Sequence, residues 1–305
     1  MFTRPFGFER AGQWAEACEL LRRYGEGAKV IAGGQSLMPL VNLGLVQPDV
    51  VIDISRAAAG RDLGVADGFV TVGALVTHAR LAADPLAAGA QPLLGAAAGK
   101  IGNARVRGRG TLGGSLAHSD PAAELPLVMV ALGATYEITD GRRSREAKAE
   151  DFHLGFLTTA LAADELVVAA RVPALGPGWG WSFQEVSRRD GDFALAAVAA
   201  LVRIAGGVIV ESRVAVGGVS DRPMRLAGTE ISLTGATVSQ IGDRIDRALG
   251  AGGVSGADGA DGADPIQGIR PVSDTSASAG YRAQLCRVLV ARALAEASSR
   301  SEEAA

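Results

Sequence analysis

The sequence predicts a two-domain protein of the α+β class. Its 305 residues exceed the usual size of one hydrophobic core, and 48% of them are hydrophobic, so the chain can fill two cores. Strand and helix patterns alternate up to about residue 175, which indicates an α/β or α+β unit. Beyond residue 181, strand patterns come first and helix patterns follow, which indicates a separate α+β domain.

Turn and cap residues place the elements of the first part. Gly25 ends the first helix. Ser36 is expected to cap a second helix, which tolerates Pro39 only within its first turn. Asp67-Gly68 is a hairpin signal between two alternating strands. The expected helices are 13–24, 37–45, 77–83, 92–99 and 122–132, and the expected strands are 29–34, 50–54, two within 62–74, two within 134–148, and 164–173.

The second part begins with a Gly/Pro-rich stretch, "LGPGWGW" at 175–181, which is the expected linker. Strands are expected within 182–187 and 194–220, followed by helices at 238–249 and 278–297 on one face of the sheet. Between these helices, residues 250–268 form a Gly/Ala/Asp repeat that predicts a surface loop. The alternative, a calcium site on its aspartates, lacks the bidentate terminal acid of such loops.

Composition and motifs exclude several classes of function. The net charge of −3 offers no attraction for nucleic acid. Three histidines and two cysteines, Cys18 and Cys286, are too few and too scattered for a zinc site or an iron–sulfur cluster. Neither a P-loop nor a Gly-x-Ser-x-Gly elbow occurs. Because no signal peptide and no apolar run of about 18 residues is found, we expect a cytoplasmic protein.

Two stretches repeat a Gly-Gly-polar-Leu pattern, "AGGQSLMPL" from Ala32 and "GTLGGSLAHSDPAAELP" from Gly110. Glycines let backbone N–H groups converge on an anion, and a helix N-terminus favours a phosphate. We therefore expect the two turns to hold a pyrophosphate from opposite sides through the amides of Gly33-Gly34 and Gly113-Gly114 and the hydroxyls of Ser36 and Ser115. The alternative is that both are structural strand-to-helix turns.

The polar residues after the second turn allow two interpretations. Glu124 is placed to accept hydrogen bonds from ribose or ribityl hydroxyls, and His118, Ser119 and Asp120 form a polar patch. The alternative is helix capping, with Asp120 as N-cap before Pro121 and Glu124 completing a capping box. For Asp120, capping is the preferred interpretation.

Four stretches together resemble the FAD-binding medium subunit of molybdenum hydroxylases, the group that includes carbon monoxide dehydrogenase, nicotine dehydrogenase and bacterial xanthine dehydrogenase-like enzymes. They are "KVIAGGQSL" from Lys29, the second glycine turn, "FQEVSRRDGDFALAAVA" from Phe183 and "SASAGYRAQLCRVLVARAL" from Ser276, in the family's order. The resemblance implies a two-lobed, PCMH-type FAD-binding domain over residues 1–175. It also implies a smaller α+β domain over residues 176–305 that shields the flavin.

The resemblance also implies cofactor-binding residues but no catalytic or metal-binding residues in this chain. The implied FAD contacts are Lys29, Val30, Ile31, Ala32, Gly33, Gly34, Gln35, Ser36, Leu37, Thr111, Gly113, Gly114, Ser115 and Ala117 for the pyrophosphate and ribityl chain, Ile101 and Gly102 near the adenosine, Glu124 for a hydroxyl, Leu166 and Val167 as apolar contacts, and Phe193 as an aromatic plate. Two positions depart from the family, because Glu185 stands where some members carry lysine and Phe193 where others carry tyrosine.

The function that the resemblance implies is electron transfer. A small subunit with [2Fe-2S] clusters and a large molybdopterin subunit would be the partners, in a dimer of heterotrimers. Electrons would pass through FAD to an external acceptor, a quinone or NAD, and the complex could lie at the inner face of the membrane. The alternatives are a stand-alone FAD-dependent oxidoreductase and a non-redox nucleotide-binding scaffold protein.

Overall fold

The computed structural model describes residues 4–249 and 266–304, which divide into two compact units. The first unit comprises the chain up to Ser119 together with 134–154 and 158–174, and the second comprises 120–133, 155–157 and the chain from Leu175 on. The predicted surface loop and its aspartates lie outside the described residues except for 266–268. Each unit contains both helices and sheets, which confirms the α+β class.

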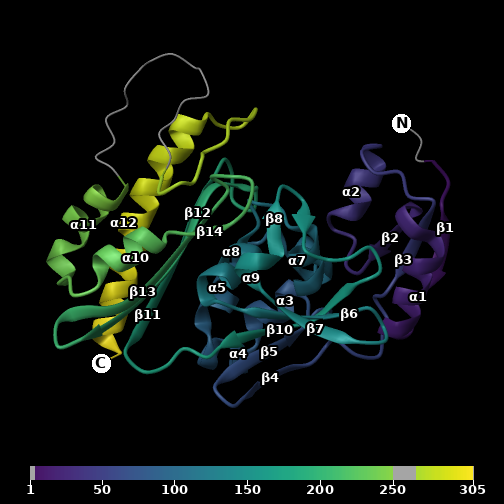
Figure 1. Ribbon diagram of the computed structural model, residues 1–305, viewed down its shortest axis with the longest axis horizontal. Coiled ribbons are helices and arrows are strands. Elements are labelled where there is room, and N and C mark those ends of the chain that lie inside the picture. Colours follow the sequence, from purple (N-terminus) through teal and green to yellow (C-terminus); the bar gives the residue numbers. More distant parts are fainter. Residues whose placement is uncertain (1–3, 250–265, 305) are drawn as a thin grey trace. The chain divides into compact units, whose positions relative to one another are not determined.

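The first lobe of the first unit is a small parallel sheet with helices in its connections (Figure 1). Its elements are β1 (Gly7–Arg10), α1 (Trp14–Tyr24), β2 (Ala28–Ile31), α2 (Leu37–Asn42) and β3 (Val50–Asp53), with strand order β1-β3-β2. Helix α1 is amphipathic and buries Ala17, Cys18 and Leu21 against the strands. Gly25 ends α1 with a positive φ of 57°, as predicted.

The second lobe is built on a five-stranded antiparallel sheet of order β4-β5-β10-β6-β7. The strands are β4 (Leu63–Ala66), β5 (Phe69–Gly73), β6 (Thr135–Thr139), β7 (Ser144–Lys148) and β10 (Leu166–Pro173), and β8 (His153–Gly155) pairs with β9 (Thr158–Thr159) in a separate sheet. The helices are α3 (His78–Ala83), α4 (Pro85–Ala90), α5 (Pro92–Lys100), α6 (Ala104–Arg109), α7 (Leu112–His118) and α9 (Ala149–Phe152). The predicted hairpin is confirmed, with Asp67 and Gly68 at φ 51° and 75°.

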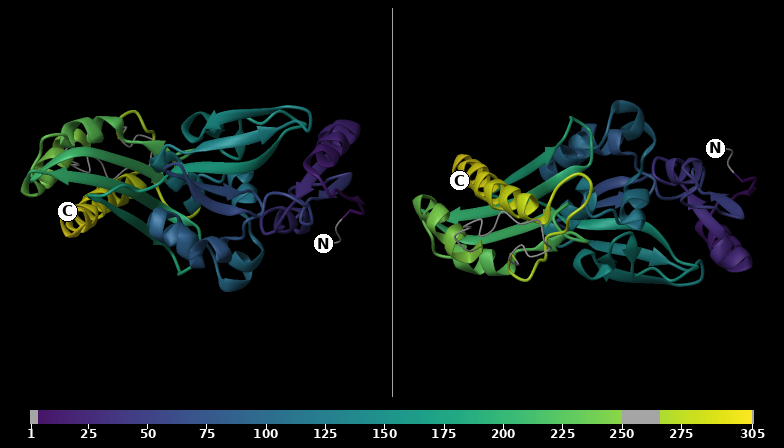
Figure 2. Two further views of the ribbon diagram at one scale, coloured as in Figure 1. Left: turned by 90° about the horizontal axis from the view of Figure 1, so that it is seen from below. Right: turned by 90° about the horizontal axis from the view of Figure 1, so that it is seen from above.

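The second unit is a four-stranded antiparallel sheet covered by helices. Its elements are α8 (Glu124–Leu132), β11 (Trp179–Ser187), β12 (Ala194–Ala205), β13 (Val208–Gly217), β14 (Met224–Arg225), α10 (Ala227–Leu233), α11 (Ile241–Leu249) and α12 (Ala279–Glu303). Figures 1 and 2 show α12 lying along the strands. The predicted linker is shorter than expected, because Trp179 and Trp181 already belong to β11 and lie beside arginine guanidinium groups of the same unit.

The two predicted helices, now α11 and α12, pack on one face of this sheet as expected, and α8 covers the opposite face. Alternate residues of β12, among them Val198 and Val202, pack with α10, α11 and α12 in one apolar cluster. The opposite face receives α8, whose Leu127 lies 3.3 Å from a Cβ placed on Gly217. Burial on both faces explains why β12 is a continuous apolar run rather than an alternating one.

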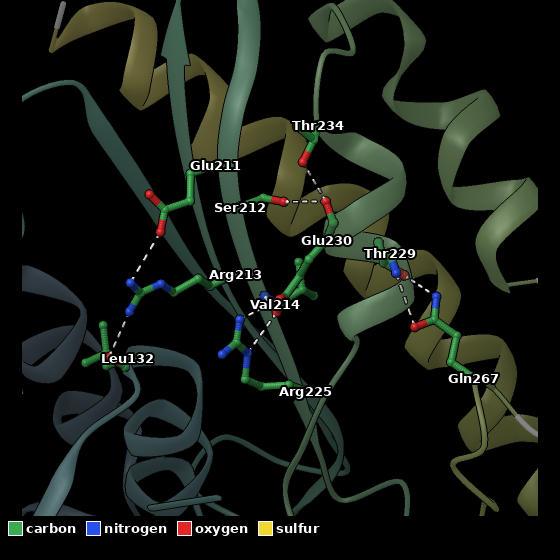
Figure 3. Close-up of polar contacts among 10 residues, drawn as sticks. All are labelled: Leu132, Glu211, Ser212, Arg213, Val214, Arg225, Thr229, Glu230, Thr234 and Gln267. Carbon is green, nitrogen blue, oxygen red and sulfur yellow. Dashed lines mark hydrogen bonds and ion pairs between the residues drawn. The ribbon is translucent and has the colours of Figure 1, made fainter. Parts of the chain in front are cut away.

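Two arginines link helices α8 and α10 to strand β13 of the second unit (Figure 3). Arg225 pairs with the carboxylate of Glu230, which also accepts a hydrogen bond from the backbone N–H of Val214 at 2.9 Å. Arg213 donates from Nη1 to the carbonyl of Leu132, the last residue of α8, at 3.1 Å. A cation at this end of α8 interacts favourably with the helix dipole, so both α8 and α10 are fixed to β13.

Among the residues that the structure describes, no helix is both long and apolar enough to span a membrane.

Candidate cofactor site

The first glycine turn joins β2 to α2. Gly34 has a φ of 72°, which favours glycine, and the side-chain amide of Gln35 donates to the carbonyl of Gly33 at 3.0 Å. Ser36 occupies the N-cap position of α2, but its side chain makes no capping hydrogen bond, so its predicted capping role is wrong. Pro39 lies in the first turn of α2, as predicted.

The backbone amides of this turn have no hydrogen-bond acceptor in the part of the chain that the structure describes. From Gly33 to Leu37, five consecutive N–H groups donate to no acceptor within residues 4–249 and 266–304. The first acceptor–donor pair of α2 is the N–H of Met38 with the carbonyl of Gly34, at 3.2 Å. Successive free amides at a helix start are suited to bind an anion such as a phosphate. We call residues 33–37 the amide loop.

The second glycine turn has the same sequence pattern but different hydrogen bonding. Leu112 and Gly113 donate to the carbonyls of Val76 and Ala74 at 2.9 and 2.8 Å. Gly114 donates to the hydroxyl of Thr111 at 3.2 Å, and Ser115 donates to the carbonyl of the same threonine. The expectation that Gly113 and Gly114 offer free amides is therefore wrong, because sheet docking and the N-cap of α7 use these groups.

The two turns meet within the first unit. A Cβ on Gly33 would collide with the carbonyl oxygen of Arg109 and lie 2.9 Å from the Cα of Gly110. Only glycine permits this approach of two backbones. The amide loop therefore lies directly against the chain that leads into Thr111.

His78 packs against the second turn at Gly110. Its backbone N–H donates to the carbonyl of Gly110 at 3.0 Å, and its ring would contact a Cβ on that glycine. The ring is 6% exposed, and neither ring nitrogen has a hydrogen-bond partner among the described residues. Burial lowers the pKa of His78 to about 4, although the backbone of Thr111 acts in the opposite direction, so the ring is neutral at pH 7.

Ile101 and Gly102 form a turn that a third arginine stabilises. Arg107 donates from Nη1 to the carbonyls of Ile101 and Gly102 at 3.0 and 2.7 Å. Gly102 has a φ of 45°. Sequence reasoning missed Arg107, and the signal that could have found it is its position on α6, capped by the side chain of Asn103.

Four of the expected contact residues belong to other elements than the glycine turns. Leu166 is 7% exposed and belongs to the apolar core around α1, and Val167 is 6% exposed beside a bulge in β10. Glu124 and Phe193 belong to the second unit, where Phe193 precedes β12 and is 69% exposed. Apart from Ile101 and Gly102, which lie between α5 and α6, the remaining expected residues fall on the amide loop, on β2 with Ala32, or on α7 and its N-cap Thr111. Gly114 and Ala117 of α7 are exposed.

Glu124 is the first residue of α8, not part of a capping box. Ala123 occupies the N-cap position, and Asp120 instead accepts a hydrogen bond from the N–H of Ala122 at 2.9 Å, so its predicted capping role is wrong. Burial raises the pKa of Glu124 to about 7, and the carboxylates of Glu185 and Asp120 act in the same direction. Within the described residues, no group of three His, Cys, Asp or Glu side chains could hold a metal ion.

Comparison with known families identifies both parts of the chain. Residues 4–175 match the profile of the FAD binding domain in molybdopterin dehydrogenase, and residues 181–249 match that of the CO dehydrogenase flavoprotein C-terminal domain.

Individual relatives match over nearly their full length. The nicotine 6-hydroxylase medium subunit of Paenarthrobacter nicotinovorans is 37% identical over 286 residues, which cover 94% of this chain and 95% of that protein. The structure of carbon monoxide dehydrogenase from Hydrogenophaga pseudoflava matches with a TM-score of 0.89 and 30% identity, over 98% of this chain and 99% of the other. Quinoline 2-oxidoreductase from Pseudomonas putida 86 matches with a TM-score of 0.88 and 32% identity, over 99% of both chains.

Proposed function

We propose a function for this chain from one premise: it belongs to the family of FAD binding domains in molybdopterin dehydrogenases. Its cofactor is FAD, and it is a flavoprotein component of an oxidoreductase. The observation that carries the proposal is the amide loop, because five free N–H groups suit the negative charge of a pyrophosphate. When bound, FAD supplies the redox chemistry, while the chain supplies binding, orientation and electrostatics.

We propose that the amide loop binds the pyrophosphate and that the exposed side of α7 contacts the ribityl chain. On α7 the contact would come through exposed atoms of Gly114 and Ala117 rather than through paired amides. Ile101-Gly102 would lie near the adenosine, Leu166 and Val167 would be apolar contacts, Glu124 would bind a hydroxyl and Phe193 would contact the flavin ring. These assignments follow the resemblance, and residues 1–175 and 176–305 would be the two functional domains.

We further propose that this chain relays electrons between subunits. It would take electrons from [2Fe-2S] clusters of a small partner and pass them to a quinone or NAD, while a large molybdopterin subunit acts on the substrate. The two cysteines of this chain support the assignment of the iron–sulfur clusters to a partner subunit. Cys18 and Cys286 are buried, and burial raises their pKa to about 11 and about 12, so neither is available as a thiolate ligand. A dimer of such heterotrimers in the cytoplasm, at the inner face of the membrane, is the proposed assembly.

Absorbance of the purified full chain tests the cofactor. We expect flavin bands and release of one FAD per chain on denaturation. A protein without flavin would contradict the proposal and favour a scaffold function. Purification from its native source tests the partners, because an isolated FAD enzyme that turns over a small substrate, without iron–sulfur and molybdenum subunits, would contradict the electron-relay role.

A pair of glycine variants tests the amide loop. Gly34→Ala introduces a side chain at φ 72° and turns the neighbouring amides, so we expect lower FAD occupancy. Gly235→Ala is the matched control, because Gly235 has a φ of 77° in the second unit and a Cβ added there would meet no atom within 4 Å. Equal FAD occupancy in the two variants would count against the amide loop as the pyrophosphate site.

A further inference from the structure

A buried cluster of three polar side chains in the first unit is not explained by the proposed contacts. The hydroxyl of Ser119 lies 2.8 Å from Nδ1 of His153, and the hydroxyl of Tyr136 lies 3.1 Å from Nε2 of the same ring. The three residues are at most 1% exposed. Phe152 packs edge-on against the tyrosine and histidine rings, with centroids 4.8 and 5.1 Å away. Both histidine nitrogens therefore have partners, and both rings are held in place.

The cluster is attached to the end of α7. Ser119 follows the last residue of that helix, and its N–H donates to the carbonyl of Ser115 at 3.1 Å. Ser119 has a φ of 52°, a left-handed conformation that is unfavourable for a residue with a Cβ. Such a conformation persists where the surroundings over-determine it, and here the bond to His153 does so. The conformation and the hydrogen bond together fix how α7 ends.

Helix α7 depends on such anchors because it has only seven residues and is too short to be stable alone. At its start, Gly113 packs against Ala74, where a Cβ would lie 2.5 Å from the alanine Cβ. At its end, Ser119 is held by His153. These two anchors set the rotation of α7 about its axis, and the same rotation decides that Gly114 and Ala117 face outward.

We propose that His153 is a positioning residue for FAD: through Ser119 it fixes the rotation of α7, and Tyr136 holds the imidazole in place. The inference rests on the proposed function, since α7 matters only if its exposed side contacts FAD. Ser119 is the link to α7, whereas Tyr136 acts one contact further away. The two histidine nitrogens therefore have unequal importance for FAD binding.

Two histidine variants test this inequality in the full chain. His153→Asn keeps a polar group near the position of Nδ1 and hence the bond to Ser119, whereas His153→Gln keeps one near Nε2 and hence the bond to Tyr136. We expect the dissociation constant of FAD to rise about tenfold more in the glutamine variant, the size of one lost buried hydrogen bond. Equal FAD affinities in the two variants would overturn the proposal. If His153 only filled space in the core, it would not matter which of its two nitrogens the variant replaces.

Two serine variants separate positioning from stability. Ser119→Ala loses the hydroxyl and keeps the left-handed strain, whereas Ser119→Gly loses the hydroxyl and relieves the strain. We expect the glycine variant to unfold at a higher temperature than the alanine variant, while both bind FAD about tenfold more weakly than the wild type. Wild-type affinity in Ser119→Gly would overturn the proposal.

Thr229→Val is the matched control for a buried hydroxyl. Thr229 is fully buried in the second unit, and its hydroxyl accepts a hydrogen bond from the side chain of Gln267 at 2.7 Å (Figure 3). We expect this variant to lose stability and to keep the wild-type FAD affinity; an equal loss of affinity would overturn the proposal. If the wild-type chain binds no FAD, the proposed function itself is wrong. If the wild type binds FAD and every variant binds it with the same affinity, only this inference is wrong.

Discussion

The two glycine turns of the first unit share a sequence pattern and differ in what their glycines do. In the first, five amides have no acceptor within the described residues, and the glycines let two backbones touch. In the second, every amide from Leu112 to Ser115 has an acceptor, and Gly113 is required because it packs against Ala74. Glycine is therefore associated with free backbone donors in one turn and with close packing in the other. Distinguishing the two uses requires the hydrogen-bond partners, which lie far away in the sequence.

The largest expected effect is at the contact between the turns. Gly33→Ala would place a Cβ against the backbone carbonyl of Arg109, so the amide loop or the chain at Arg109 must shift. We expect the dissociation constant of FAD to rise at least about 100-fold, because overpacking on this scale costs about 3 kcal/mol. Titration of the apoprotein with FAD measures it. Wild-type affinity would mean that the turns separate freely and that the comparison above is wrong.

Acid should weaken the second turn, because the buried ring of His78 packs against Gly110 at its start. Its pKa is 6.5 in the unfolded chain and about 4 in the folded chain, so the unfolded state binds more protons between these values. The stabilisation is complete above pH 6.5 and falls by about 3 kcal/mol toward pH 4. Burial lowers the pKa of His153 in the same way, so His153 adds to this loss on acidification. Glu124 has the opposite effect: because its pKa is raised to about 7, its contribution to the free energy of unfolding falls as the pH rises toward 7.

Unfolding by denaturant between pH 4 and 7 measures this dependence. A His78→Leu variant should lose stability less steeply on acidification than the wild type, because one of the two buried histidines with a lowered pKa is then removed. Glu124→Gln serves as the control with the opposite sign and should make the acid loss steeper. Parallel curves for His78→Leu and the wild type would contradict the assignment.

Neighbouring glycines of the second turn should differ in stability when each is replaced. Gly113→Ala places a Cβ 2.5 Å from that of Ala74 and should lower the free energy of unfolding by about 1–3 kcal/mol. Gly114→Ala meets only the hydroxyl of Thr111, at 3.0 Å, and should be neutral or stabilising because alanine favours the helix. Thermal unfolding of the two apoproteins measures the difference. A reversed order would show that Gly113 is not a packing residue.

The smallest expected effect concerns the two hydroxyls at the helix starts. Thr111→Val removes a capping bond from α7 and should lower the free energy of unfolding by about 1 kcal/mol. Ser36→Ala should change stability little, because Ser36 makes no capping bond to α2. Denaturant unfolding of both apoproteins measures this contrast. Equal losses in the free energy of unfolding would mean that both hydroxyls cap their helices.

Features set by neighbouring residues could be predicted from the sequence, and those set by distant ones could not. The helix ended by Gly25 and the hairpin at Asp67-Gly68 follow from backbone preferences within a few residues, and both are confirmed. Two missed helices, α4 and α6, also carried local signals, since Asp84 before Pro85 and Asn103 are their capping residues.

The acceptors of the second turn, Ala74 and Val76, lie nearly forty residues before it, so the pattern alone could not reveal that its amides are used. The same holds for His153, whose partner Ser119 is 34 residues away. The amide loop was predictable because free donors need no partner in the chain. Local patterns therefore indicated two glycine turns at helix starts, and long-range contacts decided which of them keeps free amides.

Helix α8 carries a consequence for how this protein can change during evolution. Its residues from Leu125 to Leu132 are all buried, and they pack on β12 and β13 although the chain returns to the first unit directly afterwards. A recombination event between two related genes with a crossover near residue 175 would combine α8 from one parent with the sheet of the second unit from the other parent. Successful hybrids should therefore inherit α8 and β11–β13 from the same ancestor, and these separate stretches should vary together among relatives.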